Sequence, residues 1–351
     1  MKKLISFILA VCMMSVALAS CSPFRKNTDT GVGRSTESNL PVQTQDTSDT
    51  ETDGTPAVSD TDALNTTPTG VIYNNPDLTV TGSITVPSDL SFLDGINKGH
   101  FADKNADDPK GCWWPGRISR DLTTGEITVK YDRAQETIDL INKYGAIYCG
   151  NSEEKIVYLT FDCGYEYTDA EHPNGVTSSI IDTLKTKNVT GTFFVTGDYI
   201  RERPDVIKRM LDEGHIVGTH TMHHYNMTTV TPEVFVEEIK SNNDLLKEKI
   251  PGAPDMVFYR PPEGGSCEWN LALAQQMGLC SVFWSATEAD YNTDNQPDPA
   301  QTLINDKQWL HNGCVYLLHA VSTTNAQILG ELIDYIRAEG YEIRSLADFK
   351  R

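Results

Sequence analysis

Short apolar runs alternate with amphipathic segments from about residue 150 to the end of the chain. The runs are rich in Val, Ile, Phe and Tyr, which strands favour. We predict seven strands, at residues 156–161, 191–197, 215–220, 256–260, 280–285, 314–320 and 341–346. Because most runs are apolar at consecutive rather than alternate positions, the strands are expected to be buried on both faces, as in a parallel sheet.

Helical patterns fill the segments between these strands. We predict helices at residues 177–188, 203–214, 231–249 and 325–340. The third has the clearest start, since Thr231 is a good N-cap, Pro232 suits the first turn and Glu233 favours the positive end of the helix. The fourth ends on Gly340, a usual residue just past a helix end. This alternation indicates a parallel α/β fold, in which the chemistry occurs at the carboxyl ends of the strands.

The beginning of the chain lacks this pattern. Residues 1–20 start with Lys2 and Lys3, continue with an apolar stretch and end on small residues before Cys21, which is typical of a secretory signal peptide. The sequence Leu-Ala-Ser-Cys at this point resembles a bacterial lipobox, so we expect cleavage before Cys21 and lipidation of its thiol. An ordinary signal peptide that happens to end at a cysteine is the alternative.

A polar segment separates this signal from the rest of the chain. Residues 21–70 are rich in Ser, Thr, Asp, Pro and Gly and contain too few large apolar residues to offset the entropy lost on ordering. We predict a disordered linker that connects a lipid anchor, on the outer face of the bacterial cell membrane, to an extracytoplasmic domain. Residues 71–150 are expected to be an N-terminal extension that packs on that domain.

The formal net charge of −20 argues against a nucleic-acid partner, because phosphate binding needs clustered Lys and Arg. The net charge says little about uncharged glycans. We expect a monomer that contacts the membrane only through its anchor. Six cysteines remain outside the signal peptide and the lipidated position, at residues 112, 149, 163, 267, 280 and 314. Their number permits disulfides but their scatter does not require them, so the redox state stays open.

Polar side chains follow several of the predicted strands at the point where each strand ends. They are Asp162 with Cys163, the run His220 to His224, Arg260 with Glu263, Glu288 with Asp290, and His319. One such residue is usually a cap or a satisfied core group. Several at the ends of neighbouring parallel strands meet at one edge of the sheet, which indicates a site.

The histidines suggest a metal. His220 and His224 are four residues apart, so a turn of helix after the strand would place both imidazoles on one side. His220 with His223 is the competing pair. Two neutral imidazoles with an acidic or thiolate ligand suit zinc or a similar divalent ion.

Five motifs carry a resemblance to a known family. LTFDCGYE, HTMHH, RPPEG, FWSATEADY and LLHAVS follow, in order and spacing, the motifs of polysaccharide deacetylases of the NodB-homology type, carbohydrate esterase family 4. The match covers about residues 150 to 349, so residues 151–351 are expected to be the deacetylase domain. The resemblance implies a distorted (β/α)7 barrel and a hydrolase that removes acetyl groups from a glycan with the help of a divalent metal.

The resemblance also assigns roles to the residues that act on the substrate. Asp162 matches the general base, and Arg260 matches the arginine that holds it. Asp290 matches the acid that orients His319, which in turn matches the general acid on the departing amine. Glu263 stands where a backbone N–H helps to stabilise the oxyanion. Chemistry agrees, because an acetamide needs a base on water, an acid on nitrogen and fixed donors for the oxyanion.

The match to the family is less complete for the metal ligands. His220 and His224 match two of the family's ligands, but Cys163 replaces the aspartate that most relatives use as the third. Three interpretations follow. Cys163 ligates zinc as a thiolate, or it contributes nothing and two imidazoles hold the metal with water, or metal is not needed in the usual way.

A narrower resemblance concerns the substrate. The first motif, Asp294 to Pro297 and Leu317 to Ala326 are most like the delta-lactam-biosynthetic de-N-acetylase, which acts on muramic acid of peptidoglycan. N-acetylmuramic acid in peptidoglycan strands is therefore the expected target. N-acetylglucosamine of peptidoglycan or another β-1,4 glycan is the alternative within the enzyme class. A glycan-binding lipoprotein that has lost catalysis through Cys163 is the alternative outside it.

Overall fold

The computed structural model describes residues 77–78, 80–96, 117–130 and 135–351, all of which belong to the unit Asp62–Arg351. The predicted signal peptide, Cys21, the linker 21–70 and much of the extension 71–150, with Cys112, lie outside the described residues. Within the described part of the chain, no helix combines the length and the apolar character needed to cross a membrane.

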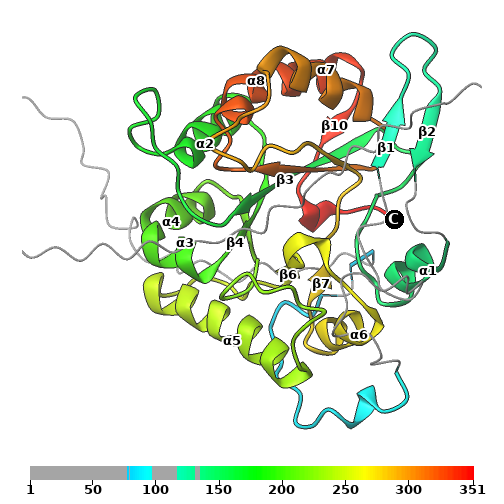
Figure 1. Cartoon of the computed structure of the whole chain (residues 1–351), viewed down its shortest axis with the longest axis vertical. Coiled ribbons are helices and arrows are strands. Elements are labelled where there is room, and N and C mark those ends of the chain that lie inside the picture. Colours follow the sequence, from blue (N-terminus) through cyan, green and yellow to red (C-terminus); the bar gives the residue numbers. More distant parts are fainter. Residues whose placement is uncertain (1–76, 79, 97–116, 131–134) are drawn as a thin grey trace, which may run out of the picture. The chain divides into compact units, whose positions relative to one another are not determined.

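One curved sheet of parallel strands forms the centre of the described unit (Figure 1). Its strands are β3 Ile156–Cys163, β4 Thr192–Val195, β5 Ile216–Thr219, β6 Phe258–Tyr259, β7 Cys280–Ser281, β8 Ala286–Thr287, β9 Cys314–His319 and β10 Glu342–Ile343. The order is β7-β6-β5-β4-β3-β9-β8, with β10 also paired to β3. A separate antiparallel hairpin joins β1 Arg117–Arg120 to β2 Ile127–Lys130. All seven predicted strands are present.

A single stretch of chain, residues 280–287, joins the two ends of the sheet. It pairs with β6 at its start, where Cys280 lies opposite Phe258, and with β9 at its end, where Ala286 lies opposite Tyr316. Between these points its backbone continues the same contacts, since the Ser285 N–H donates to the carbonyl of Val315. Of the predicted strand 280–285, Cys280–Ser281 is a strand, and the second short strand, Ala286–Thr287, begins just after the predicted end. The sheet is that of a distorted (β/α)7 barrel, as expected.

Helices surround the strands (Figure 1). They are α1 Gln135–Lys143, α2 Val176–Thr186, α3 Gly197–Glu202, α4 Pro204–Asp212, α5 Pro232–Lys249, α6 Glu268–Gln276, α7 Pro299–Trp309 and α8 Thr323–Ala338. The four predicted helices correspond to α2, α4, α5 and α8. The Thr231 hydroxyl accepts from the Val234 N–H to cap α5, and Gly340, at φ 81°, follows α8 as expected.

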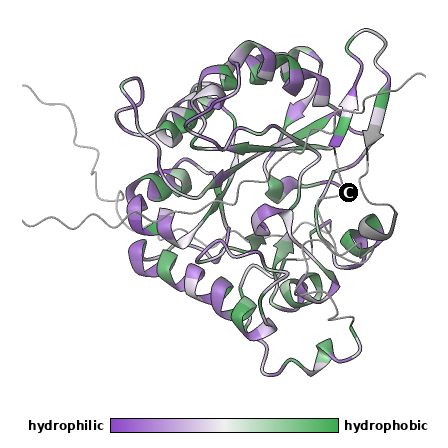
Figure 2. Cartoon of the chain, in the orientation of Figure 1, coloured by the Kyte–Doolittle hydropathy of each residue, from purple (hydrophilic) through white to green (hydrophobic). Residues whose placement is uncertain are grey.

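The two faces of the sheet are both buried, and Figure 2 shows the apolar strands enclosed by helices whose outer sides are hydrophilic. Successive residues of a strand point to opposite faces. Along β3, Leu159 and Phe161 belong to the core between the sheet and its helices, whereas Ile156 and Tyr158 belong to the core inside the barrel. This alternation decides which side chains at the end of β3 reach the barrel mouth.

Candidate active site

Asp162 lies at the carboxyl end of β3 and is paired with a fully buried arginine. The Arg260 Nη1 donates to Asp162 Oδ1 at 2.8 Å, and Nη2 donates to the Thr160 hydroxyl at 2.7 Å. The guanidinium also donates to the carbonyls of Val282 and Phe283. Because every one of these partners is on the barrel frame, both the arginine and the carboxylate are fixed in place.

This pairing sets the charge of the carboxylate. Burial would raise the pKa of Asp162, but the positive charge of Arg260, with smaller effects of the His220 and His319 imidazoles, outweighs it and holds that pKa below its ordinary 3.8. Asp162 is therefore ionised at neutral pH, in the state that a general base requires.

The loop after β5 brings His220 and His224 together, with ring centroids 4.8 Å apart. The predicted turn of helix is wrong. The loop is irregular and has positive φ at Thr221 (67°) and His224 (57°). It rests on α3, since Gly197 N–H donates to the carbonyls of Thr221 and Met222. A Cβ at Gly197 would lie 2.6 Å from the Met222 carbonyl oxygen, so the close approach requires glycine.

Both imidazoles are neutral. Burial lowers the pKa of His220 to about 4, and burial likewise lowers the pKa of His224. His220 Nδ1 donates to the Arg260 carbonyl at 2.8 Å, which leaves the lone pair on Nε2, 3.5 Å from Asp162 Oδ2. A backbone acceptor on one ring nitrogen is the usual way in which a protein orients a histidine for a metal.

His319, at the end of β9, is held by Asp290 from the loop after β8. His319 Nδ1 donates to Asp290 Oδ1 at 2.6 Å, and its backbone N–H donates to Oδ2 at 2.9 Å. Asn325 Nδ2 donates to the same oxygen. Burial would lower the pKa of His319, but the adjacent carboxylate outweighs it and raises that pKa. Since Nδ1 is engaged, the proton that His319 can deliver is on Nε2.

Glu263 lies in the turn Pro262–Gly264 after β6 and has φ 58° and ψ 8°, a left-handed conformation that is uncommon for a residue with a side chain. Its exposed carboxylate accepts from Asn226 Nδ2 at 2.9 Å, which ties the Arg260 loop to the histidine loop. The backbone strain lies in the turn where the resemblance puts an oxyanion donor.

Cys163 lies apart from these groups. It is fully buried in the core between the sheet and its helices, together with Val176 and Tyr199, because it follows Asp162 on the strand and faces the other way. Burial, and then the charges of Glu166 and Asp162, raise the pKa of the Cys163 thiol well above its ordinary value. Among the described residues no group of three or more His, Cys, Asp or Glu side chains is placed to hold a metal. A thiolate ligand at Cys163 is therefore not compatible with this placement.

Sequence reasoning missed the residues that hold the site groups. Thr160, whose hydroxyl bridges Arg260 and the Tyr316 carbonyl, has no signal beyond its place two residues before Asp162. Asn325 lies within the motif-like segment after β9, and its position there is the one available hint. Glu288, at the same strand end as Asp290, accepts from Asn305 rather than from a site residue.

An ionised carboxylate, a carboxylate-held histidine and two neutral imidazoles thus meet at the mouth of a parallel barrel. Residues 150–282 match the polysaccharide deacetylase family model. The chain is also 41% identical over 217 residues to the peptidoglycan-N-acetylmuramic acid deacetylase PdaA of Bacillus subtilis, an alignment that covers 62% of this chain and 80% of that protein. The chain therefore belongs to the polysaccharide deacetylases of carbohydrate esterase family 4, hydrolases of carbon–nitrogen bonds other than peptide bonds.

A solved structure of the same relative and one further relative agree with this assignment. The solved structure of Bacillus subtilis PdaA, described as a family 4 carbohydrate esterase, matches with a TM-score of 0.61 and 36% identity over 69% of this chain and 97% of that one. The peptidoglycan-N-acetylglucosamine deacetylase PgdA of Listeria monocytogenes is 29% identical over 188 residues, which is 54% of this chain and 37% of that protein.

Proposed function

We propose that this protein hydrolyses the N-acetyl group of N-acetylmuramic acid in peptidoglycan glycan strands. The observation that supports this chemistry is a pair of groups at the barrel mouth whose pKa values are shifted in opposite directions. The pKa of Asp162 is lowered and the pKa of His319 is raised, so the first is ionised and the second is biased toward protonation. Two groups whose environments separate their pKa values in this way are a base and an acid.

Asp162 takes a proton from the attacking water. His319 gives its Nε2 proton to the nitrogen as the C–N bond breaks, and the products are acetate and a free amine on the sugar. Asp290 keeps the imidazole in one orientation and stabilises its protonated form. Arg260 prevents Asp162 from taking up a proton before the substrate arrives.

A divalent metal is part of the proposal. His220 and His224 would hold it through their neutral imidazoles, which suit zinc, and the remaining ligands would be water or substrate. When bound, a metal supplies Lewis-acid polarisation of the acetyl carbonyl.

The sugar is inferred from relatives. Identity to the muramic acid deacetylase PdaA is 41%, against 29% to the glucosamine deacetylase PgdA. The experiment treats peptide-free glycan strands with the full chain, with and without added zinc, and locates lost acetyl groups by mass spectrometry. We expect loss at muramic acid with wild type and none with Asp162→Ala. Loss at glucosamine alone would replace the substrate, and no loss with any metal would reject the enzyme.

A further inference from the structure

Exposed aromatic side chains gather in the loops that carry the site residues. Among the described residues, the large apolar or aromatic side chains classed as exposed include only three aromatic ones, Tyr165, Tyr225 and Tyr291. They follow β3, β5 and β8, close to Asp162, His224 and Asp290 in the sequence. A single exposed apolar residue needs no explanation. Within the part of the chain that the structure describes, the restriction of the exposed aromatic rings to these loops does need one.

Tyr225 packs against His223, which is itself fixed by hydrogen bonds. Its ring stacks on that of His223, with centroids 5.4 Å apart and planes at 23°. His223 donates twice to Glu238 of α5, from Nδ1 at 2.6 Å and from its backbone N–H at 2.8 Å. The Glu238 side chain is 5% exposed whereas that of His223 is 50% exposed. The buried carboxylate thus fixes a platform whose outer ring, Tyr225, remains open to solvent.

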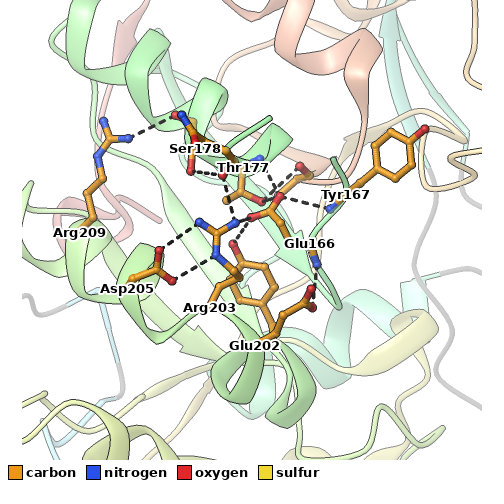
Figure 3. A network of polar contacts seen from close by, with 11 residues as sticks. Glu166, Tyr167, Thr177, Ser178, Glu202, Arg203, Asp205 and Arg209 are labelled. Atoms are coloured by element: carbon orange, nitrogen blue, oxygen red, sulfur yellow. Dashed lines mark hydrogen bonds and ion pairs between the residues drawn. The ribbon is translucent and has the colours of Figure 1, made fainter. Parts of the chain in front are cut away.

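The loop that carries Tyr165 is held by a second buried glutamate, Glu166, the next residue in the chain. The Glu166 carboxylate, 2% exposed, accepts from Arg203, from Tyr199 and from both the hydroxyl and the N–H of Thr177 (Figure 3). These donors belong to α2 and α3 and to the start of α4, so the loop after β3 is tied to the surrounding helices. On the other side, the Tyr165 hydroxyl lies 3.5 Å from the Thr293 hydroxyl of the loop after β8.

We propose that Tyr165 and Tyr225 bind the sugars that flank the reacting one in a glycan strand. The proposal rests on the proposed function and names residues that select an extended substrate. Tyr225 lies against the α5 side of the mouth and Tyr165 against the β8 side. The C–H face of a pyranose packs on the electron-rich face of an aromatic ring. Rings on loops already held by buried glutamates bind at a lower entropic cost than rings on mobile loops.

The test compares Tyr225→Ala and Tyr165→Ala with Tyr225→Phe, which keeps the ring, and with Leu122→Ala, which removes an exposed side chain from the β1–β2 turn. With the full chain we expect each alanine variant to raise KM for long glycan strands about three- to tenfold, with kcat unchanged. The phenylalanine variant and the control are expected to match wild type. On the monosaccharide N-acetylmuramic acid, which has no flanking sugar, the alanine variants should also match wild type.

Glycan binding, measured by calorimetric titration with the same strands, separates this proposal from the proposed function. If wild type releases acetyl groups and the alanine variants keep its KM, the tyrosine proposal is overturned and the enzyme stands. If wild type binds strands without releasing acetyl groups, the enzyme fails, and weaker binding by the alanine variants would still support the tyrosines. A rise in KM that is equal on long strands and on the monosaccharide would overturn the flanking-sugar role.

Discussion

Replacement of Arg260 by methionine tests the central ion pair of the site. The change removes a guanidinium with no solvent exposure and leaves an unbranched apolar side chain. It deletes hydrogen bonds of 2.8 Å to Asp162 and 2.7 Å to Thr160, and it leaves the Asp162 carboxylate buried without its cation. Breaking a buried ion pair from one side costs about 3–5 kcal/mol, most of it from the charge left behind. We expect that loss in the free energy of unfolding at neutral pH.

The dependence on pH has a definite sign. The pKa of Asp162 is lower in the folded protein than its ordinary 3.8, so the pair contributes stability above that value. This contribution is lost as the pH falls through the lowered folded-state pKa. The gap between wild type and Arg260→Met should therefore be widest at neutral pH and should narrow in acid.

A double-mutant cycle tests whether the unpaired charge of Asp162 causes the loss of stability in Arg260→Met. Asp162→Asn removes the charge that Arg260→Met leaves unpaired, so the double variant should be more stable than the sum of the two single changes predicts, by about 1–3 kcal/mol. The measurement is urea unfolding of the full chain, followed by circular dichroism at several pH values. Additive single effects, or a neutral-pH loss below about 1 kcal/mol, would refute the ion-pair reasoning.

Three further changes test other parts of the site. Cys163→Ala should leave zinc affinity and acetyl release unchanged, because the thiol faces the core, and a loss of zinc binding in calorimetry would contradict this. Asp290→Asn removes the carboxylate that raises the pKa of His319, so the basic limb of the kcat/KM profile should move to lower pH; an unmoved limb would show that another group controls it. Glu238→Gln loosens the support of Tyr225 and should raise KM for long strands about two- to threefold with kcat unchanged, and a fall in kcat would indicate damage to the catalytic groups instead.

The strands could be predicted because a parallel sheet buried on both faces requires consecutive apolar residues, as in β3. The helix α7, Pro299–Trp309, could not. Its buried positions include Thr302 and Asp306, so the apolar stripe that marks an amphipathic helix is interrupted. The break between β7 and β8 also has no local signal, since it depends on which strands the two ends of residues 280–287 meet.

The site residues could be found from their place at strand ends, but the geometry between them could not. A four-residue spacing suggested a helical turn for His220 and His224, whereas a loop with positive φ at Thr221 and His224 brings the rings together. Threonine rarely adopts positive φ, so the residue type at position 221 does not predict this conformation. The constraint comes from Gly197 on another element, whose missing Cβ admits the loop.

The adjacent residues Asp162 and Cys163 show how a strand places two reactive side chains in different environments. Because neighbours on a strand face opposite sides, one residue enters the barrel mouth beside Arg260 and the other enters the core beneath α2 and α3. The outer face already holds the buried carboxylate of Glu166, whose charge opposes ionisation of the thiol. The inner face holds the Arg260 guanidinium, whose positive charge favours ionisation of Asp162. The adjacent carboxylate and thiol are therefore placed in electrostatic environments that favour ionisation of the first and oppose ionisation of the second, and only the carboxylate lies beside Arg260 at the barrel mouth.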